Sequence, residues 1–149
     1  MGDTNLKERI VADKLQHHVI YVDDLDRSTA FYTKLFDLQF SAHNHPDSSA
    51  AMRLSQQQMH FFSFGFYHHD ICLVKHLKCK MDNGSMMHFA LVARDAAAFD
   101  AIRRRASEMG VETRDGRLIA SAKAVPGGRA FHFRDPNNHW IEILQESSI

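Results

Sequence analysis

The sequence predicts an α+β fold made of two β-α-β-β-β modules, because three features occur twice along the chain. Each half opens with a histidine and an apolar run, HVIYV at residues 18–22 and HFALV at residues 88–92. A helical segment headed by an aspartate follows each run, and further strand-like segments come after it. The opening histidines are 70 residues apart, and His69 and Glu142 are 73 apart. This near-equal spacing indicates a duplicated unit.

The first module is expected to span about residues 15–76. Its opening strand, residues 18–22, alternates so little that the pattern predicts burial on both faces. Asp24 or Asp26 is expected to cap the following helix. The apolar face of that helix, at spacing i, i+4, i+7, carries Phe31, Leu35 and Leu38. The other strands are expected at residues 39–42, 59–66 and 69–75, with a loop at 43–49.

The second module is expected to span about residues 86–146. Asp95 is expected to cap its helix and Gly110 to end it at the C′ position. The apolar face of this helix carries Phe99, Ile102, Ala106 and Met109. Strands are expected at residues 88–93, 111–114, 117–121, 130–134 and 140–144, with turns at 115–116 and 135–138. Both modules are expected to belong to one domain, residues 1–149.

The composition is that of a globular protein with no preference for polyanions or membranes. The 149 residues are 44% hydrophobic and 24% charged, and 18 basic residues balance 18 acidic ones. A net charge of +0 gives no reason to expect a nucleic-acid or membrane partner. The two cysteines and the absence of a recognisable signal peptide lead us to expect reduced thiols and a cytoplasmic location. Histidine is the unusual residue, with 11 copies.

Three residues at strand positions have the chemistry of a metal site: His18, His88 and Glu142. Two imidazoles and one carboxylate form the facial triad that holds iron(II) and leaves coordination positions open. His17 and His18 are adjacent on one strand and therefore face opposite ways, so only one of them can reach a shared interior.

Glu142 stands inside an apolar strand, where an unpaired carboxylate would be costly. Either a metal ion or an arginine partner would account for it, and the sequence leaves both open.

Four segments resemble the vicinal oxygen chelate superfamily of glyoxalases, bleomycin resistance proteins and extradiol dioxygenases. They are HHVIYVDDLDRSTAFYTKLF, YHHDICLV, MHFALVARDAAAFDAI and FHFRDPNNHWIEI. They are most similar to the metal-bearing module of type I extradiol ring-cleaving dioxygenases, over about residues 15–146. The resemblance implies that the two modules form a cupped, barrel-like mixed sheet around a metal. It also implies His18, His88 and Glu142 as the ligands.

The resemblance further implies candidate catalytic residues. It places His69 beside the metal, where extradiol enzymes carry an acid/base histidine, and an imidazole suits that task near neutral pH. Glyoxalase-like members instead take a fourth metal ligand from the equivalent strand. His132 and Lys123 occupy places where many extradiol enzymes have a tyrosine and another histidine. Either side chain is expected to be able to donate a hydrogen bond to a bound oxygen.

The reaction implied by the resemblance is Fe(II)-dependent extradiol cleavage of a catechol-type ring by O2. One alternative is a glyoxalase-like or epimerase-like isomerase or lyase that uses Mn, Ni, Co or Zn without O2. The other is a non-enzymatic protein that binds small molecules such as drugs. Members of that kind generally lack the metal residues, which the present sequence retains.

A homodimer is also expected, because related proteins of this size usually pair. The aromatic segment MHFFSFGFY, residues 59–67, holds more apolar surface than one cup interior is expected to need. Exposed apolar patches of this kind tend to mark interfaces, and two-fold dimers are the commonest assemblies. The alternative is that these aromatic side chains alternate between the two faces of the sheet and are covered within one chain.

Overall fold

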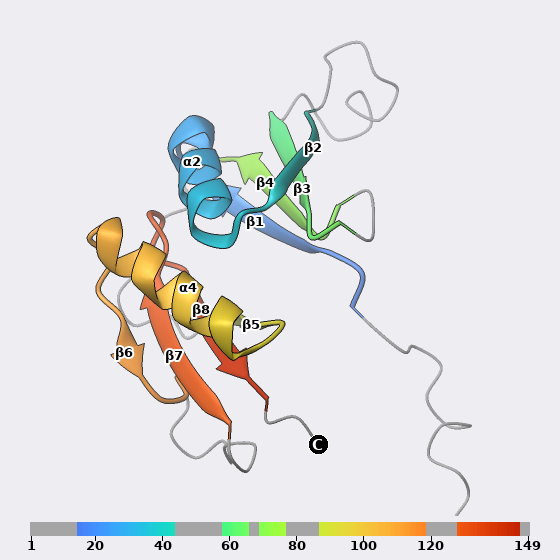
Figure 1. The fold of residues 1–149 in the computed structure, drawn as a ribbon. Coiled ribbons are helices and arrows are strands. Elements are labelled where there is room, and N and C mark those ends of the chain that lie inside the picture. The colour runs from blue at the N-terminus through green and yellow to red at the C-terminus, as the bar shows by residue number, and fades with distance from the viewer. Residues whose placement is uncertain (1–14, 44–57, 66–68, 77–86, 119–127, 147–149) are drawn as a thin grey trace, which may run out of the picture.

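The computed structural model describes residues 15–43, 58–65, 69–76, 87–118 and 128–146 (Figure 1). The first module consists of β1 (His18–Val22), α2 (Leu25–Phe36), β2 (Gln39–His43), β3 (Met59–Ser63) and β4 (Ile71–Lys75). The second consists of β5 (His88–Val92), α4 (Ala96–Glu108), β6 (Arg114–Asp115), β7 (Arg129–Arg134) and β8 (Trp140–Gln145). The predicted α+β fold with two β-α-β-β-β modules is confirmed.

Each module forms its own four-stranded sheet, in the orders β1-β4-β3-β2 and β5-β8-β7-β6. The first and last strands of each module run parallel, and the other neighbours are antiparallel. Over the described residues, the two sheets do not close into a barrel. Their registers match, because Ile20 lies opposite Leu73 just as Leu91 lies opposite Ile143. Equivalent positions of the two modules are therefore 71 residues apart in the first strand (Ile20 and Leu91) and 70 apart in the last (Leu73 and Ile143).

The two helices begin where the sequence predicts. Asp24 is the N-cap of α2, and its side chain accepts a hydrogen bond of 2.9 Å from the backbone N–H of Arg27. Asp95 caps α4 in the same way, with a 2.7 Å bond from Ala98. Gly110 follows the end of α4 with φ 70°, the left-handed conformation that favours glycine. Among the described residues, no helix is long and apolar enough to cross a membrane.

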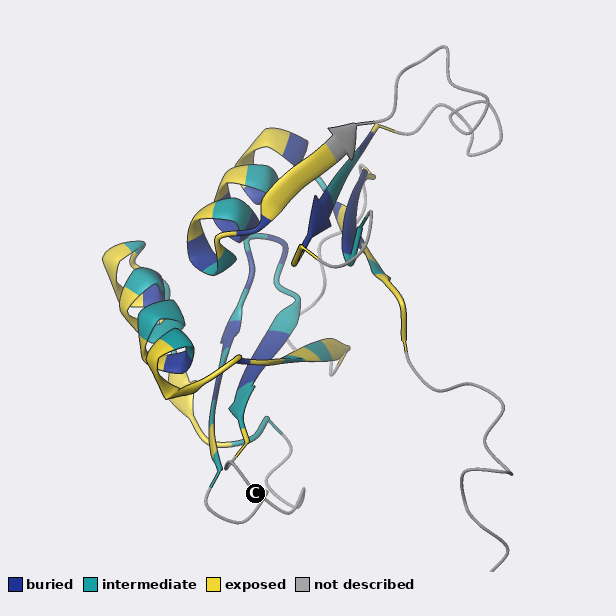
Figure 2. Cartoon of the chain, turned by 45° about the vertical axis from the view of Figure 1, so that its right-hand side comes forward, coloured by how far each residue is buried: buried dark blue, intermediate teal, exposed yellow. Residues whose placement is uncertain are grey.

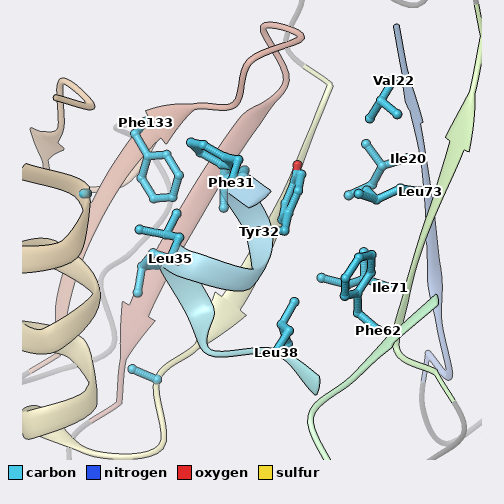
Figure 3. Close-up of a cluster of buried hydrophobic side chains, with 14 of the residues drawn as sticks. Ile20, Val22, Phe31, Tyr32, Leu35, Leu38, Phe62, Ile71, Leu73 and Phe133 are labelled. Atoms are coloured by element: carbon cyan, nitrogen blue, oxygen red, sulfur yellow. The ribbon is translucent and has the colours of Figure 1, made fainter. Parts of the chain in front are cut away.

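One hydrophobic cluster joins the two modules. It takes apolar residues from one face of each sheet and from both helices. Figure 3 shows side chains of α2 inside this cluster. Tyr32, together with Leu38 just after the helix, lies on the side of the first sheet, and Phe31 and Leu35 lie on the side of Phe133 of β7. Each sheet therefore has a core face, turned toward this cluster, and an outer face turned away from it.

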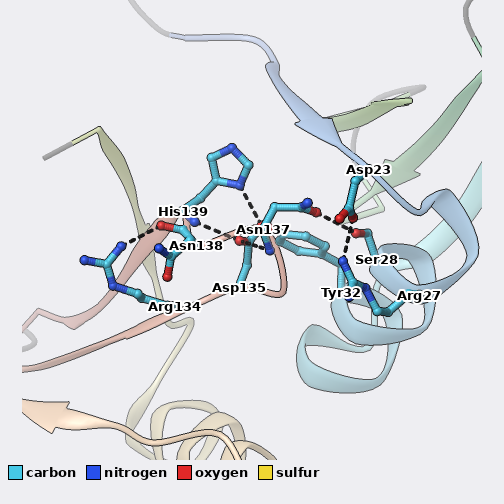
Figure 4. Close-up of polar contacts among 9 residues, drawn as sticks. All are labelled: Asp23, Arg27, Ser28, Tyr32, Arg134, Asp135, Asn137, Asn138 and His139. Atoms are coloured by element: carbon cyan, nitrogen blue, oxygen red, sulfur yellow. Dashed lines mark hydrogen bonds and ion pairs between the residues drawn. The ribbon is translucent and has the colours of Figure 1, made fainter. Parts of the chain in front are cut away.

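A buried polar network also connects the modules (Figure 4). The Tyr32 hydroxyl on α2 donates a 2.7 Å hydrogen bond to Oδ2 of Asp135, in the turn between β7 and β8. His139 lies 2.9 Å from the same oxygen through Nδ1, and the backbone N–H groups of Asn137 and His139 donate to Oδ1. The Ser28 hydroxyl of α2 reaches the Asn137 side chain at 3.3 Å. The turn predicted at residues 135–138 is thus tied to the helix of the other module.

Two details differ from the sequence-based expectations. β1 is not buried on both faces: Ile20 and Val22 are buried, whereas Val19 is 45% and Tyr21 50% exposed. Figure 2 shows how buried and exposed residues alternate around the two helices. An edge strand that packs one face on the core can leave its other face open. An apolar run in the sequence does not distinguish a strand buried on one face from a strand buried on both. Within the described part of residues 111–121, only Arg114–Asp115 forms a strand, and it pairs with β7. Residues 119–121 and most of the loop at 43–49 lie outside the described residues.

Candidate metal centre

Two of the expected ligands share the outer face of the second sheet. On β5, Phe89 and Leu91 pack against the core, while His88 is exposed on the opposite face. On β8, Ile141 and Ile143 belong to the core, so Glu142 between them points to the outer face. Glu142 lies opposite Ala90, two residues beyond His88. An imidazole and a carboxylate therefore stand on neighbouring strands of one face.

Glu142 also has the arginine partner that the sequence left open. The carboxylate is only 1% exposed, and its Oε1 accepts a 2.7 Å hydrogen bond from Nε of Arg117. The backbone N–H of Leu118 donates to the same oxygen at 2.9 Å. The burial of this carboxylate is thus offset by an ion pair and by a backbone donor. Sequence reasoning missed Arg117, whose one signal is its place directly after the Asp115-Gly116 turn.

His132, on β7, is the cross-strand neighbour of Glu142. Its Nδ1 lies 3.0 Å from the carbonyl oxygen of Gly116, and its ring meets Trp140 edge-on at 5.4 Å between centroids. The position places His132 on the same outer face as Glu142. Lys123, the other candidate hydrogen-bond donor, lies outside the described residues.

His17 and His18 face opposite sides of the strand, as alternation requires. His18 lies on the core side, which it shares with Ile20 and Val22. Its ring lies 5.0 Å from that of Phe89, a residue packed against the core. Burial lowers the pKa of His18 below its ordinary value, and the neighbouring His139 and His17 act in the same direction. This placement is on the core side of β1, and the assignment of His18 as a metal ligand stays a prediction.

His17 instead continues the outer face of β1, ahead of Val19 and Tyr21. Its ring centroid lies 4.8 Å from that of His69, and His69 lies 5.0 Å from Phe61. The expected acid/base histidine therefore has His17, rather than His18, beside it.

The equivalence of the two modules also favours His17, rather than His18, as the counterpart of His88. His17 precedes the N-cap Asp24 by seven residues, and His88 precedes the N-cap Asp95 by seven. His17 is therefore the counterpart of His88, 71 residues earlier. This spacing relative to the helix caps is present in the sequence and indicates His17, rather than His18, as the counterpart of His88.

The counterpart of Glu142 in the first module is Cys72, because Val19 pairs with Cys72 as Ala90 pairs with Glu142. Cys72 is buried beside Met59 and Val74. Burial raises the pKa of its thiol to about 11. The position in the first module that corresponds to Glu142 therefore holds a buried thiol in an apolar setting.

We expect the Cys72 thiol to react slowly with iodoacetamide in the folded protein at pH 8. The thiolate is the nucleophile, and a pKa of about 11 leaves very little of it at that pH. A Cys79→Ser variant isolates Cys72 as the remaining thiol, so mass spectrometry can follow its labelling alone. Urea should restore the rate of an ordinary cysteine; a fast reaction without urea would contradict the buried placement.

The candidate ligands do not converge on one point within a single chain. Across the described parts of the chain, no three His, Cys, Asp or Glu side chains are grouped so that they could hold a metal ion. His17 belongs to the outer face of the first sheet, and His88 and Glu142 to that of the second. Because both core faces are turned toward the shared cluster, these outer faces are turned away from it.

Comparison with known proteins agrees with this architecture. The family model described as the Glyoxalase/Bleomycin resistance protein/Dioxygenase superfamily matches residues 14–143. No curated protein matches the sequence significantly.

Solved structures share the fold at low sequence identity. One is a mutant of the fosfomycin resistance protein FosX from Listeria monocytogenes, complexed with Mn(II) and 1S,2S-dihydroxypropylphosphonic acid. It is 21% identical, with TM-score 0.64, over 89% of this chain and 92% of the other. FosX from Mesorhizobium loti is 24% identical, with TM-score 0.63, over 89% and 91%. A glyoxylase/bleomycin resistance protein/dioxygenase domain from Frankia sp. EAN1pec is 18% identical, with TM-score 0.69, over 91% and 99%.

These structures support the fold, and no particular closeness to extradiol dioxygenases is shown. The match to the family model covers most of the chain and includes both histidines of the outer faces as well as Glu142. This chain therefore belongs to the glyoxalase/bleomycin resistance protein/dioxygenase superfamily.

Proposed function

We propose that this protein is a divalent-metal-dependent enzyme whose site is completed by a second copy of the chain. His17 of one copy and His88 and Glu142 of the other are the proposed ligands, so His17 takes the role expected of His18. The observation that carries this proposal is the placement of equivalent histidines, His17 and His88, on outer faces that one chain turns away from its core.

The donor set fits a divalent transition metal. Two imidazoles and a carboxylate suit Mn(II), Fe(II), Co(II), Ni(II) or Zn(II) and leave coordination positions for a substrate. Cys72, the counterpart of Glu142 in the first module, is packed among apolar side chains, which favours a three-ligand site unless His69 supplies a fourth ligand. A bound metal would act as a Lewis acid on two neighbouring oxygens of a small substrate.

Apolar surface beside the proposed ligands supports pairing of two copies. Val19 and Tyr21 flank the His17 side of the site, and Val92, 56% exposed, continues the face of His88. Patches of this kind tend to mark interfaces, and a two-fold dimer would bury both outer faces together. The aromatic segment at residues 59–67 contributes less than expected, because Met59 and Phe62 are buried within one chain and Phe64 is the exposed member among its described residues.

The proposed catalytic role of His69 follows from its position beside His17. A proton carrier must lie close to the reacting oxygens, and a group adjacent to a metal ligand satisfies this requirement. In this arrangement His69 takes a proton from a substrate oxygen as it binds and returns one later. His132, next to Glu142, is placed to donate a hydrogen bond to a substrate oxygen from the other side.

Two reactions are candidates within this class. Extradiol cleavage of a catechol by O2 at Fe(II) is favoured by the acid/base histidine beside a proposed ligand. A reaction without O2 on a small phosphonate is favoured by the likeness of the fold to FosX proteins, one of which was solved with Mn(II) and a dihydroxypropylphosphonic acid.

Metal loading followed by two assays separates these reactions. Protein purified without oxygen is loaded with Fe(II) or Mn(II), and bound metal is counted after gel filtration. Oxygen uptake is then measured with a series of catechols, and conversion of fosfomycin is followed by phosphorus NMR. Retention of metal with turnover in either assay supports the proposal, whereas a dimer that binds neither ion contradicts it.

We expect His69→Ala to retain the metal and to lose activity. A general acid/base group contributes about 10²–10⁴-fold to turnover, so kcat should fall by that factor while metal content is unchanged. Measurements of metal content and kcat on the same preparation test the two roles together. Loss of the metal along with the activity would instead make His69 a fourth ligand.

A further inference from the structure

We infer that Arg117 is a positioning residue for Glu142, which it holds so that Oε2 is the oxygen presented to the metal. This inference rests on the proposed metal site. A carboxylate has two oxygens and can bind a metal through one or both. Which mode it adopts depends on what the protein attaches to each oxygen.

The hydrogen bonds of Glu142 are unequally distributed between its oxygens. Nε of Arg117 and the backbone N–H of Leu118 both donate to Oε1, at 2.7 and 2.9 Å. Within the described residues these are the hydrogen bonds that the Glu142 carboxylate makes, and none falls on Oε2. The carboxylate is 1% exposed, so it cannot exchange these donors freely for water. Oε1 is therefore committed to the protein, and Oε2 is the oxygen left for a ligand bond.

The donors follow a turn at Gly116, directly after β6. Gly116 adopts φ 88°, a conformation that favours glycine, and its N–H donates to the carbonyl of Ala130 on β7 at 2.9 Å. The Gly116 carbonyl oxygen lies 3.0 Å from Nδ1 of His132, the residue opposite Glu142. Arg117 and Leu118 follow directly, so the strand that neighbours β8 holds the donors in place.

A charged donor on Oε1 has two consequences for a metal at Oε2. It fixes the orientation of the ligand before the metal arrives, and it favours binding through a single oxygen. Residues that hold metal ligands in this way commonly contribute about 10–100-fold to metal affinity. We therefore assign Arg117 to the metal site although it does not contact the ion.

The test measures Mn(II) affinity of the full chain by the electron paramagnetic resonance signal of free Mn(II). R117Q removes the charge and the Nε–H group and is expected to weaken binding by about 10–100-fold. R117K keeps the charge without the planar donor and should fall between R117Q and the wild type. R129Q is the matched control, because Arg129 pairs with Gln145 and Asp100 rather than with Glu142, and its affinity should equal that of the wild type.

Infrared difference spectra supply a second readout that a purely structural arginine would not change. The splitting between the two carboxylate stretches should report one-oxygen binding in the wild type and two-oxygen binding in R117Q, where Oε1 is released. R117K serves for both measurements if R117Q does not fold. Mn(II) binding by R117Q that is as tight as wild type, or tighter, overturns the inference alone. Absence of Mn(II) binding by the wild-type dimer overturns the proposed site together with it.

Discussion

A mixed dimer with His17→Ala in one chain and His88→Ala in the other is expected to bind about one metal ion, whereas each variant alone binds none. The proposed site takes His17 from one copy and His88 with Glu142 from the other. The mixed dimer therefore retains one complete ligand set, formed by the intact His17 of one chain and the intact His88 of the other. Its second site lacks both histidines.

The reciprocal dimer reverses the result and makes the experiment decisive. When both substitutions are placed in one chain and the other is wild type, each shared site loses one histidine and no metal should bind. Sites built within single chains would give the opposite pattern: none in the first dimer and one in the second. Co-expression with two different affinity tags isolates each mixed dimer, and elemental analysis counts the metal.

His18→Ala is the matched control for the histidine assignment. His18 neighbours His17 in sequence, but its ring lies beside Phe89 on the side of the core. The substitution should leave the metal content of the homodimer unchanged. Loss of metal in His18→Ala, with retention in His17→Ala, would restore the assignment drawn from the family resemblance.

The fold was largely predictable because its signals are local. Asp24, Asp95 and Gly110 act within one helical turn, and the apolar period of each helix reports its buried face. The choice between His17 and His18 depends on which face of β1 is covered, and that is set by packing of distant segments. An apolar run such as HVIYV does not show it, because Val19 and Tyr21 are as apolar as their buried neighbours.

The surroundings of the site were less predictable, since they depend on pairings between strands. The pairing of β6 with β7 brings Arg117 to Glu142. The local pattern at residues 117–121 predicts a strand instead, because it contains nothing that reports this long-range pairing. The family resemblance predicts that the ligands converge in a cup, and this stays a prediction. Packing of α2 and α4 against the core faces decides where the outer faces of the two sheets lie, and no local pattern reports the arrangement of two sheets.

Removal of the Asp135 carboxylate is expected to cause a large loss of stability. The side chain is fully buried, and its oxygens accept from Tyr32, from the backbone of Asn137, and from both the backbone and the ring of His139. Asp135→Ala leaves these donors without an acceptor in a site closed to water. Breaking a buried network of this kind costs about 3–5 kcal/mol, measured as the free energy of unfolding in urea. Asp115→Ala is the control: its pair with Arg103 is exposed, and such pairs contribute about 0–1 kcal/mol.

Tyr32→Phe removes only the hydrogen bond between the modules and leaves the bonds within the 135–139 turn intact. Burial, followed by the charge and hydrogen bond of Asp135, raises the pKa of Tyr32 well above its ordinary range, so the hydroxyl stays a donor at any working pH. The variant removes that one bond and should cost about 1–3 kcal/mol, less than Asp135→Ala. Trp140, the single tryptophan, reports the second module by fluorescence, while circular dichroism reports both. Because the shared core still joins the modules, both signals should change in one transition; separate transitions in Tyr32→Phe would show that this bond alone makes the modules unfold together.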